Sequence, residues 1–139
     1  MLREMLANEE DLTRIATSKV TNMSALFYGA ETFNQAIGNW DLSKVTTVHS
    51  MFYGATSFNQ DISTWNVSSV TSMKAMFYGA TSFNQPIGNW DLSNVNNISF
   101  MFYDAITFNQ NLSNWDIKNI RNHFSFSFNT PNWLLSKPI

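Results

Sequence analysis

A 25-residue repeat is the feature of this sequence that most restricts its fold. Four consecutive copies, 26–50, 51–75, 76–100 and 101–125, share seven identical positions. In the first copy these positions are Phe27, Tyr28, Ala30, Phe33, Asn34, Gln35 and Trp40. Self-similarity at a fixed period indicates stacked units, each of which buries its apolar face against its neighbours. We therefore expect a repeat protein without a single central core.

One part of each unit has apolar residues at helical spacing. Where the first two copies join, they are Val45, Val48, Met51, Phe52 and Ala55. Offsets of three, six, seven and ten residues match one face of a short helix. Gly54 suits the C-terminal end of such a helix. Because every copy repeats this pattern, we expect one short helix per unit.

A second part of each unit alternates apolar and polar residues. Trp40 and Leu42 follow Ile37, and each copy carries an equivalent set. Alternation over so few residues indicates a short strand. The sequence therefore predicts an α/β repeat solenoid that is similar to leucine-rich repeats, with one short strand and one short helix per 25-residue coil. A parallel β-helix is the alternative.

The two ends depart from the repeat, as terminal units of such arrays do. Residues 1–18 place Leu2, Met5, Leu6 and Leu12 close to one helical face, and we interpret them as an N-terminal capping segment. Residues 19–126 form the predicted solenoid. Residues 127–139, which contain Pro131 and Pro138, form the predicted C-terminal cap.

Composition and charge argue against several functions. Charged residues make up 13% of the chain, against about 25% in typical domains, and the net charge is −2. No basic block suggests nucleic-acid binding, and no apolar run approaches the roughly 18 residues that a membrane-spanning helix needs. There is no cysteine, and His49 and His123 have no partners at metal-ligand or catalytic spacing. We expect no enzyme activity, no cofactor, no metal site, no nucleic-acid partner and no membrane insertion.

Two rows of residues, each identical in all four copies, are interpreted as structural. Asn34 and its copies are expected to form an internal ladder that satisfies backbone groups of buried turns. Trp40 and its copies are either a core row or a stacked aromatic row for sugar rings. Alternation with apolar Leu42 favours the core.

The candidate binding residues form two other rows. Each tyrosine follows a core phenylalanine and is turned about 100° from it on the predicted helix. We expect a partly exposed strip for protein or glycan, with simple coverage of the adjacent coil as the alternative. The strip is Tyr28, Tyr53, Tyr78 and Tyr103.

The second row is polar and consists of Asp41, Asn66, Asp91 and Asp116. Each carboxylate is expected to accept hydrogen bonds from amides of the next turn. A calcium row and a polar binding surface are the alternatives, although one oxygen ligand per coil is few for calcium.

The stretch Asp41-Leu-Ser-Lys-Val-Thr-Thr-Val-His-Ser-Met-Phe-Tyr-Gly-Ala-Thr-Ser-Phe-Asn-Gln-Asp-Ile resembles BspA-like leucine-rich repeats of bacterial surface proteins. It is more similar to the "mycoplasma protein of unknown function" repeat, which reads Trp-Asp-Val-Ser-x-Val-Thr-x-Met-x-x-Met-Phe-x-x-Ala-x-x-Phe-Asn-Gln. The similarity runs from about Ser18 to Ile117. It implies a non-catalytic adhesion or protein-interaction module at a cell surface or outside the cell.

Two other functions stay open, namely a structural spacer or assembly element and a carbohydrate-binding module. The expected partner is a protein or a glycan. Residues 1–11 lack the apolar core of a secretory signal, so a cytoplasmic location is an alternative to the cell surface.

Overall fold

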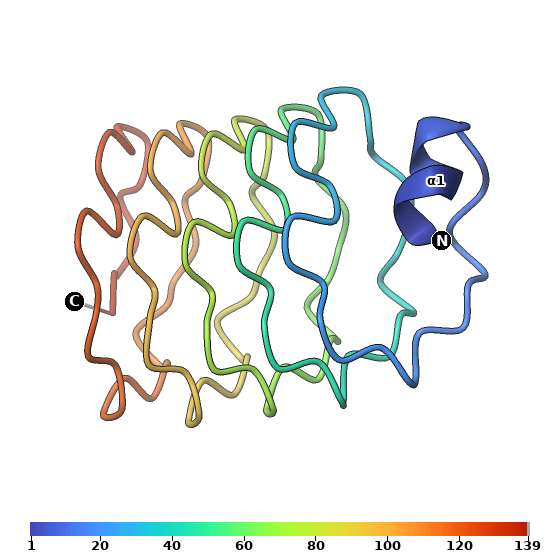
Figure 1. Ribbon diagram of the computed structural model, residues 1–139. Helices are drawn as coiled ribbons and strands as arrows, with labels where there is room; N and C mark the ends of the chain where they lie inside the picture. Colours follow the sequence, from blue (N-terminus) through green and yellow to red (C-terminus); the bar gives the residue numbers. More distant parts are fainter. Residues whose placement is uncertain (139) are drawn as a thin grey trace.

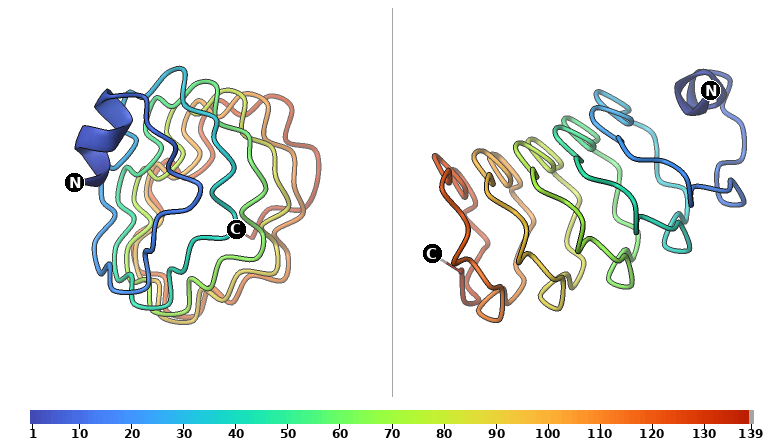
Figure 2. Two further views of the ribbon diagram at one scale, coloured as in Figure 1. Left: turned by 90° about the vertical axis from the view of Figure 1, so that its right-hand side faces the viewer. Right: turned by 60° about the horizontal axis from the view of Figure 1, so that its bottom comes forward.

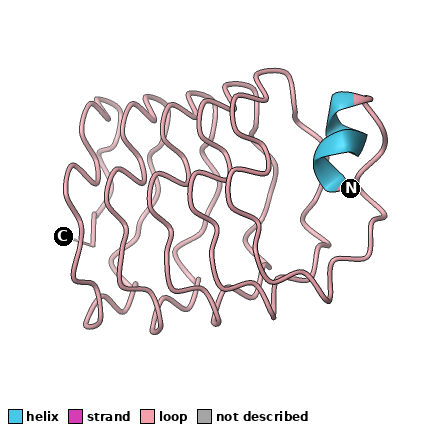
Figure 3. Cartoon of the chain, viewed as in Figure 1, coloured by secondary structure: helices cyan, strands magenta, loops and turns pink. Residues whose placement is uncertain are grey.

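The computed structural model describes residues 1–138 as a stack of irregular coils, one for each 25-residue repeat, with the termini at opposite ends (Figure 1). Viewed along the stack, successive coils follow nearly the same outline (Figure 2). Helix α1, Leu2–Ala7, is the single helix in the described part of the chain. The rest is loop and turn, without a named strand (Figure 3). Residue 139 of the predicted C-terminal cap lies outside the described residues.

The predicted α/β class is wrong, because the apolar pattern read as a helix forms successive turns. Met51, Tyr53 and Ala55 each donate a backbone hydrogen bond to the carbonyl three residues earlier. Ser50 and Gly54 have φ values of 55° and 68°, in the left-handed region. A left-handed residue interrupts an α-helix. Overlapping turns that each span three residues bury side chains at nearly helical spacing, which explains why the pattern is interpreted as a helix.

The predicted strand is absent as well, and so is the parallel β-helix. Trp40 donates its backbone N–H to Ile37 O, and Val45 donates to Leu42 O, so the alternating segment is a pair of turns. The nearest approach to a sheet is a row of isolated parallel bridges between equivalent residues of adjacent coils. They join Asn22 to Thr47, Thr47 to Ser72, Ser72 to Asn97, and Asn97 to Asn122.

Backbone hydrogen bonds between coils replace the sheet. Every second N–H in the turn segment donates to a carbonyl 24 residues later. These bonds run from Val48 to Ser72 (3.1 Å), Ser50 to Lys74 (2.9 Å), Phe52 to Met76 (2.9 Å) and Gly54 to Tyr78 (2.7 Å). The intervening N–H groups make the local turn bonds, so both sets of donors are satisfied. All bonds in this ladder point the same way, from each coil to the next.

The expected asparagine ladder exists, but it is not internal. Asn59 N–H donates to Asn34 Oδ1, Asn84 N–H to Asn59 Oδ1, and Asn109 N–H to Asn84 Oδ1, each at 2.9 Å. Asn34 and Asn59 are exposed, and the other two are half-buried. The amides therefore connect coils at the surface of the stack.

Aromatic rings fill the interior in continuous rows. Phe52 and Phe58 stack at 4.0 Å between centroids, and Phe52 lies 5.6 Å from Phe77 in the next coil. Trp40, Trp65, Trp90 and Trp115 are all buried. The prediction that the tryptophans belong to the core is confirmed, and their faces are closed to sugar rings.

Candidate functional site

The four tyrosines form one continuous column along the stack. Tyr28 and Tyr53 lie 4.6 Å apart between ring centroids, Tyr53 and Tyr78 4.4 Å, and Tyr78 and Tyr103 4.6 Å. Interplanar angles of 11°, 6° and 5° make these parallel stacks. The cross-coil ladder explains this order, because Gly54 N–H bonds to Tyr78 O and holds adjacent tyrosine backbones in register.

Phe128 extends the column to a fifth ring. It stacks on Tyr103 at 4.8 Å and 20°. Sequence reasoning missed this residue, although the repeat contains the signal: Phe128 is 25 residues after Tyr103. We define the tyrosine column as Tyr28, Tyr53, Tyr78, Tyr103 and Phe128.

Exposure differs between the ends and the middle of the tyrosine column. Tyr28 and Phe128 are each 57% exposed, whereas the three rings between them are half-buried. The inner rings cover one another's faces and present ring edges. Desolvation raises the pKa of Tyr78 above its ordinary value, and the neighbouring Tyr53 and Tyr103 raise it further. The Tyr78 hydroxyl therefore remains a neutral hydrogen-bonding group at physiological pH.

The polar row is exposed, and its hydrogen bonds differ from those expected. Asp41 Oδ1 accepts the N–H of Ser43 at 2.8 Å, and Asp91 Oδ1 accepts that of Ser93 at 2.9 Å. These are turns within one coil, formed two residues along the chain, so the expectation of bonds from the next turn's amides is wrong. Hydrogen bonding by the Ser43 side chain and then its backbone lowers the pKa of Asp41.

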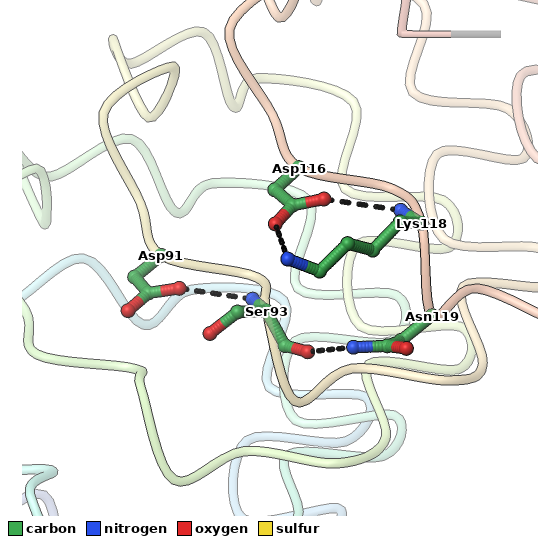
Figure 4. Close-up of polar contacts among 5 residues, drawn as sticks. All are labelled: Asp91, Ser93, Asp116, Lys118 and Asn119. Atoms are coloured by element: carbon green, nitrogen blue, oxygen red, sulfur yellow. Dashed lines mark hydrogen bonds and ion pairs between the residues drawn. The ribbon is translucent and has the colours of Figure 1, made fainter.

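Figure 4 shows the end of this row nearest the C-terminus. Asp116 Oδ1 accepts the Lys118 N–H at 3.1 Å, and Asp116 Oδ2 pairs with Lys118 Nζ at 3.1 Å. Bonding from the Lys118 backbone, then its side chain, lowers the pKa of Asp116. Asn119 Nδ2 donates to Ser93 O in the previous coil at 2.6 Å. The carboxylates thus shape turns, and neighbouring side chains join the coils.

The two predicted rows are not brought together. Within residues 1–138, neither a hydrogen bond nor a ring contact joins the tyrosine column to the polar row. Those residues also contain no group of three or more His, Cys, Asp or Glu side chains placed to hold a metal ion. The tyrosine column is therefore the continuous aromatic surface available for contact.

Comparison with known proteins gives one match. A family model described as "Mycoplasma protein of unknown function, DUF285" matches residues 1–115. No curated protein and no solved structure matches the chain. Helix α1, which is six residues long, cannot cross a membrane, and the described part of the chain has no other helix. Since the matched segment covers most of the 139 residues, the chain belongs to this Mycoplasma protein family of unknown function.

Proposed function

We propose that this chain is a non-catalytic interaction module that binds a protein partner along the tyrosine column. One observation carries the proposal: five aromatic rings, partly exposed, form an unbroken stack outside the phenylalanine core. Tyrosine is enriched among residues that dominate binding energy at protein interfaces. It combines an apolar ring with a hydroxyl that donates and accepts hydrogen bonds.

The order of the rings favours binding. Each inner ring is held between two neighbours at 4.4–4.8 Å between centroids, so few rotamers are left to lose when a partner docks. Immobilising a free side chain at an interface costs about 0.5–1.5 kcal/mol, and a preordered surface avoids much of this cost. The column therefore offers contact area at low entropic cost.

Stacking also favours a protein over a glycan as the partner. Sugar rings pack against the faces of aromatic side chains, and the faces of Tyr53, Tyr78 and Tyr103 are covered by neighbouring rings. What remains along the column is a line of ring edges and hydroxyls. Peptide backbone and apolar side chains suit such a line, with the hydroxyls bonding to backbone groups.

A structural role is the competing hypothesis. In that case the rings simply cover adjacent coils, and the repeats supply length and rigidity. The cell-surface location is part of our proposal and is supported by the similarity to BspA-like surface repeats. Screening distinguishes the hypotheses, because a spacer has no specific ligand.

The test begins with a screen of the purified chain against protein and glycan arrays. Any ligand found is then measured against two double variants. Tyr53→Ser/Tyr78→Ser interrupts the tyrosine column. Asp41→Asn/Asp91→Asn removes two of the three carboxylates of the polar row while keeping its turns, as Asn66 already does. We expect a protein ligand whose binding is lost in the first variant and kept in the second. The reverse pattern, or a glycan ligand alone, would contradict the proposal.

A further inference from the structure

Within the turn segment, the one-way direction of the backbone ladder gives the two ends of the stack opposite hydrogen-bonding character. A single bond per coil, from Thr46 N–H to Thr21 O and its copies, runs the other way. In the last coil the carbonyls of Asn122, Phe124, Phe126 and Phe128 accept bonds from the preceding coil. The alternate N–H groups would continue the ladder, but they find no acceptor among residues 1–138. These donors are His123, Ser125, Ser127 and Asn129. The C-terminal end therefore presents four backbone donors at two-residue spacing.

The first coil presents the matching acceptors. In the second coil the carbonyls of Thr47, His49, Met51 and Tyr53 each accept a ladder bond. Their counterparts in the first coil are the carbonyls of Asn22, Ser24, Leu26 and Tyr28. Of these four, Ser24 O alone has a partner within the described chain: the Arg3 guanidinium donates to it at 2.8 Å.

Helix α1 is a weak cover for this end. It lies at the N-terminal end of the stack (Figure 2), in the sequence register where an earlier coil would have its turn segment. It has six residues and no side-chain N-cap, and none of its residues is fully buried, although Leu2, Met5 and Leu6 pack partly buried against the core. Helices this short have little stability of their own. Two gaps, of about 630 and 610 Å³, are lined by residues of α1 and the first coil, including Leu6 with Tyr28 and Leu2 with Met23.

The two ends of the stack also have complementary terminal rings and opposite net charges. Tyr28 and Phe128 are the terminal rings of the tyrosine column, and each is 57% exposed. Residues 1–14 contain four acidic and two basic side chains, whereas residues 116–139 contain one acidic and three basic side chains. Opposite charges attract the ends and orient the encounter. Two C-terminal ends would instead place these four donors against each other, which disfavours a symmetric contact at this end.

We propose that α1 is a displaceable cover and that, once it lifts, a second copy of this chain stacks head to tail on the first coil. His123, Ser125, Ser127 and Asn129 of one copy then donate to Asn22, Ser24, Leu26 and Tyr28 of the next. Phe128 of the first copy meets Tyr28 of the second, so the tyrosine column continues across the junction. Repetition of this heterologous contact generates a filament.

The repeat register also requires that one terminal segment moves when two copies stack. In a continuous stack, residues 126–138 of one copy would overlap residues 1–13 of the next, and once α1 lifts, residues 134–138 and 9–13 still compete for the same place. Leu134 is 84% exposed and Leu135 is 49% exposed, so this segment is the one that moves aside. Its displacement breaks the Leu134 and Leu135 N–H bonds to Asn109 Oδ1 and the Leu112 N–H bond to Ser136 O. Leu12 is fully buried and receives the Trp40 Nε1 bond at 3.0 Å, which holds residue 12 in place.

The experiment uses the whole 139-residue chain with one end changed at a time. Arg3→Ser/Leu6→Ser releases α1, and Glu4→Gln is the matched control on the same helix. Arg121→Glu/Phe128→Asp blocks the C-terminal end, and Phe128→Tyr is its control because tyrosine is the residue of the other copies. Sedimentation velocity gives the mass of each species, and urea midpoints show that each variant folds.

We expect the wild-type chain to be monomeric at micromolar concentration and the release variant to form a ladder of larger masses. Combining release with the C-terminal block should restore the monomer. Mixing the chain that carries both the release and the blocking changes with wild type should give a one-to-one dimer. The changed chain has only its first coil open, and the wild-type chain has only its C-terminal end open. A monomeric release variant, or association that survives the block, would overturn the proposal.

Should the release variant unfold, wild type at millimolar concentration supplies the second measurement. Weak association that disappears in Arg121→Glu/Phe128→Asp and persists in Phe128→Tyr supports head-to-tail stacking. Association indifferent to both changes, or none at all, contradicts it. These outcomes are read as the mass of the chain alone with no ligand present, so a failure of stacking is distinguishable from a failure of the proposed function.

Discussion

Trp65 Nε1 donates a 3.0 Å hydrogen bond to the carbonyl oxygen of Ile37, 28 residues earlier in the chain. Trp90 bonds in the same way to Ile62 O, and Trp115 to Ile87 O. These bonds lie where backbone ladder bonds between coils are absent, so the indole N–H connects adjacent coils there. The same ring also fills the core. One residue per repeat thus satisfies a polar group and buries a large apolar surface.

Replacing Trp65 with Phe should therefore destabilise the chain. We expect a loss of about 2 kcal/mol, because the buried hydrogen bond and part of the ring volume disappear. Ile37 O keeps its bond from Trp40 N–H at 3.1 Å, which limits the cost. Urea unfolding measures the change, with Tyr53→Phe as the control, expected within about 0.5 kcal/mol. An equal change in unfolding free energy in both variants would show that the indole hydrogen bond does not stabilise the contact between coils.

The asparagine ladder predicts a second difference in stability. Asn84 Oδ1 accepts the Asn109 N–H at 2.9 Å and Gln110 Nε2 at 3.0 Å. Asn84→Ala removes both bonds and should cost about 1–2 kcal/mol. Lys74→Ala, at a position that varies between copies, should stay within about 0.5 kcal/mol. Coincident urea midpoints for the two variants would show that the ladder contributes no stability.

The sequence predicted the period and the buried rings, because both follow from identity at fixed spacing. Phe52, Phe58 and Trp65 are all in the core, as expected. It did not predict the backbone path. Met51, Phe52 and Ala55 have helical spacing, but the turns around Ser50 and Gly54 give nearly the same spacing without a helix. The periodicity of apolar residues indicates which side chains are buried. A helix and a series of turns can bury the same set of side chains.

The candidate site was predicted in part. Tyr53 and Tyr78 do lie in a row, although the reason offered was their position on a helix that does not exist. Stacking at 4.4 Å depends on the cross-coil ladder, which no local pattern reveals. The open donors of the last coil were equally hidden, because hydrogen-bond direction is a property of the assembled stack.

Two glycines provide a third prediction. A Cβ on Gly38 would lie 2.5 Å from the carbonyl oxygen of Asp61 in the next coil, and Gly88 faces Asn111 O in the same way. Gly38→Ala should therefore cost about 1–3 kcal/mol through overpacking against backbone. Ser63→Ala is the control, since residue 63 occupies the equivalent position and already carries a Cβ. A Gly38→Ala chain as stable as the control would show that the coils adjust freely.

Acid should weaken the turns of the polar row. Hydrogen bonds from Ser43 and Ser93 lower the pKa values of Asp41 and Asp91 in the folded chain. A carboxyl with a lowered folded-state pKa stabilises the fold above its unfolded pKa of about 3.9 and loses this contribution as the pH falls through the folded value. Urea midpoints should be constant from neutral pH to about pH 5 and then decline.

The matched variant for this acid effect is Asp41→Asn/Asp91→Asn. Asparagine forms the same turn, as Asn66 does with the Ser68 N–H at 3.1 Å, but it does not titrate. The decline below about pH 4 should be smaller in this variant than in wild type. Identical pH profiles would show that these carboxylates do not contribute to acid sensitivity.

The tyrosine column is tested most directly by comparing affinity and stability in Tyr53→Ser/Tyr78→Ser. Removing two rings at an interface should weaken partner binding more than tenfold, at about 1–2 kcal/mol per ring. The chain should stay folded and lose about 1–2 kcal/mol from the missing stacks. Tyr53→Phe/Tyr78→Phe keeps the stacks and isolates the hydroxyls. Undiminished binding in the serine variant, or collapse of its unfolding midpoint, would show that the column is structural and contradict the proposed binding surface.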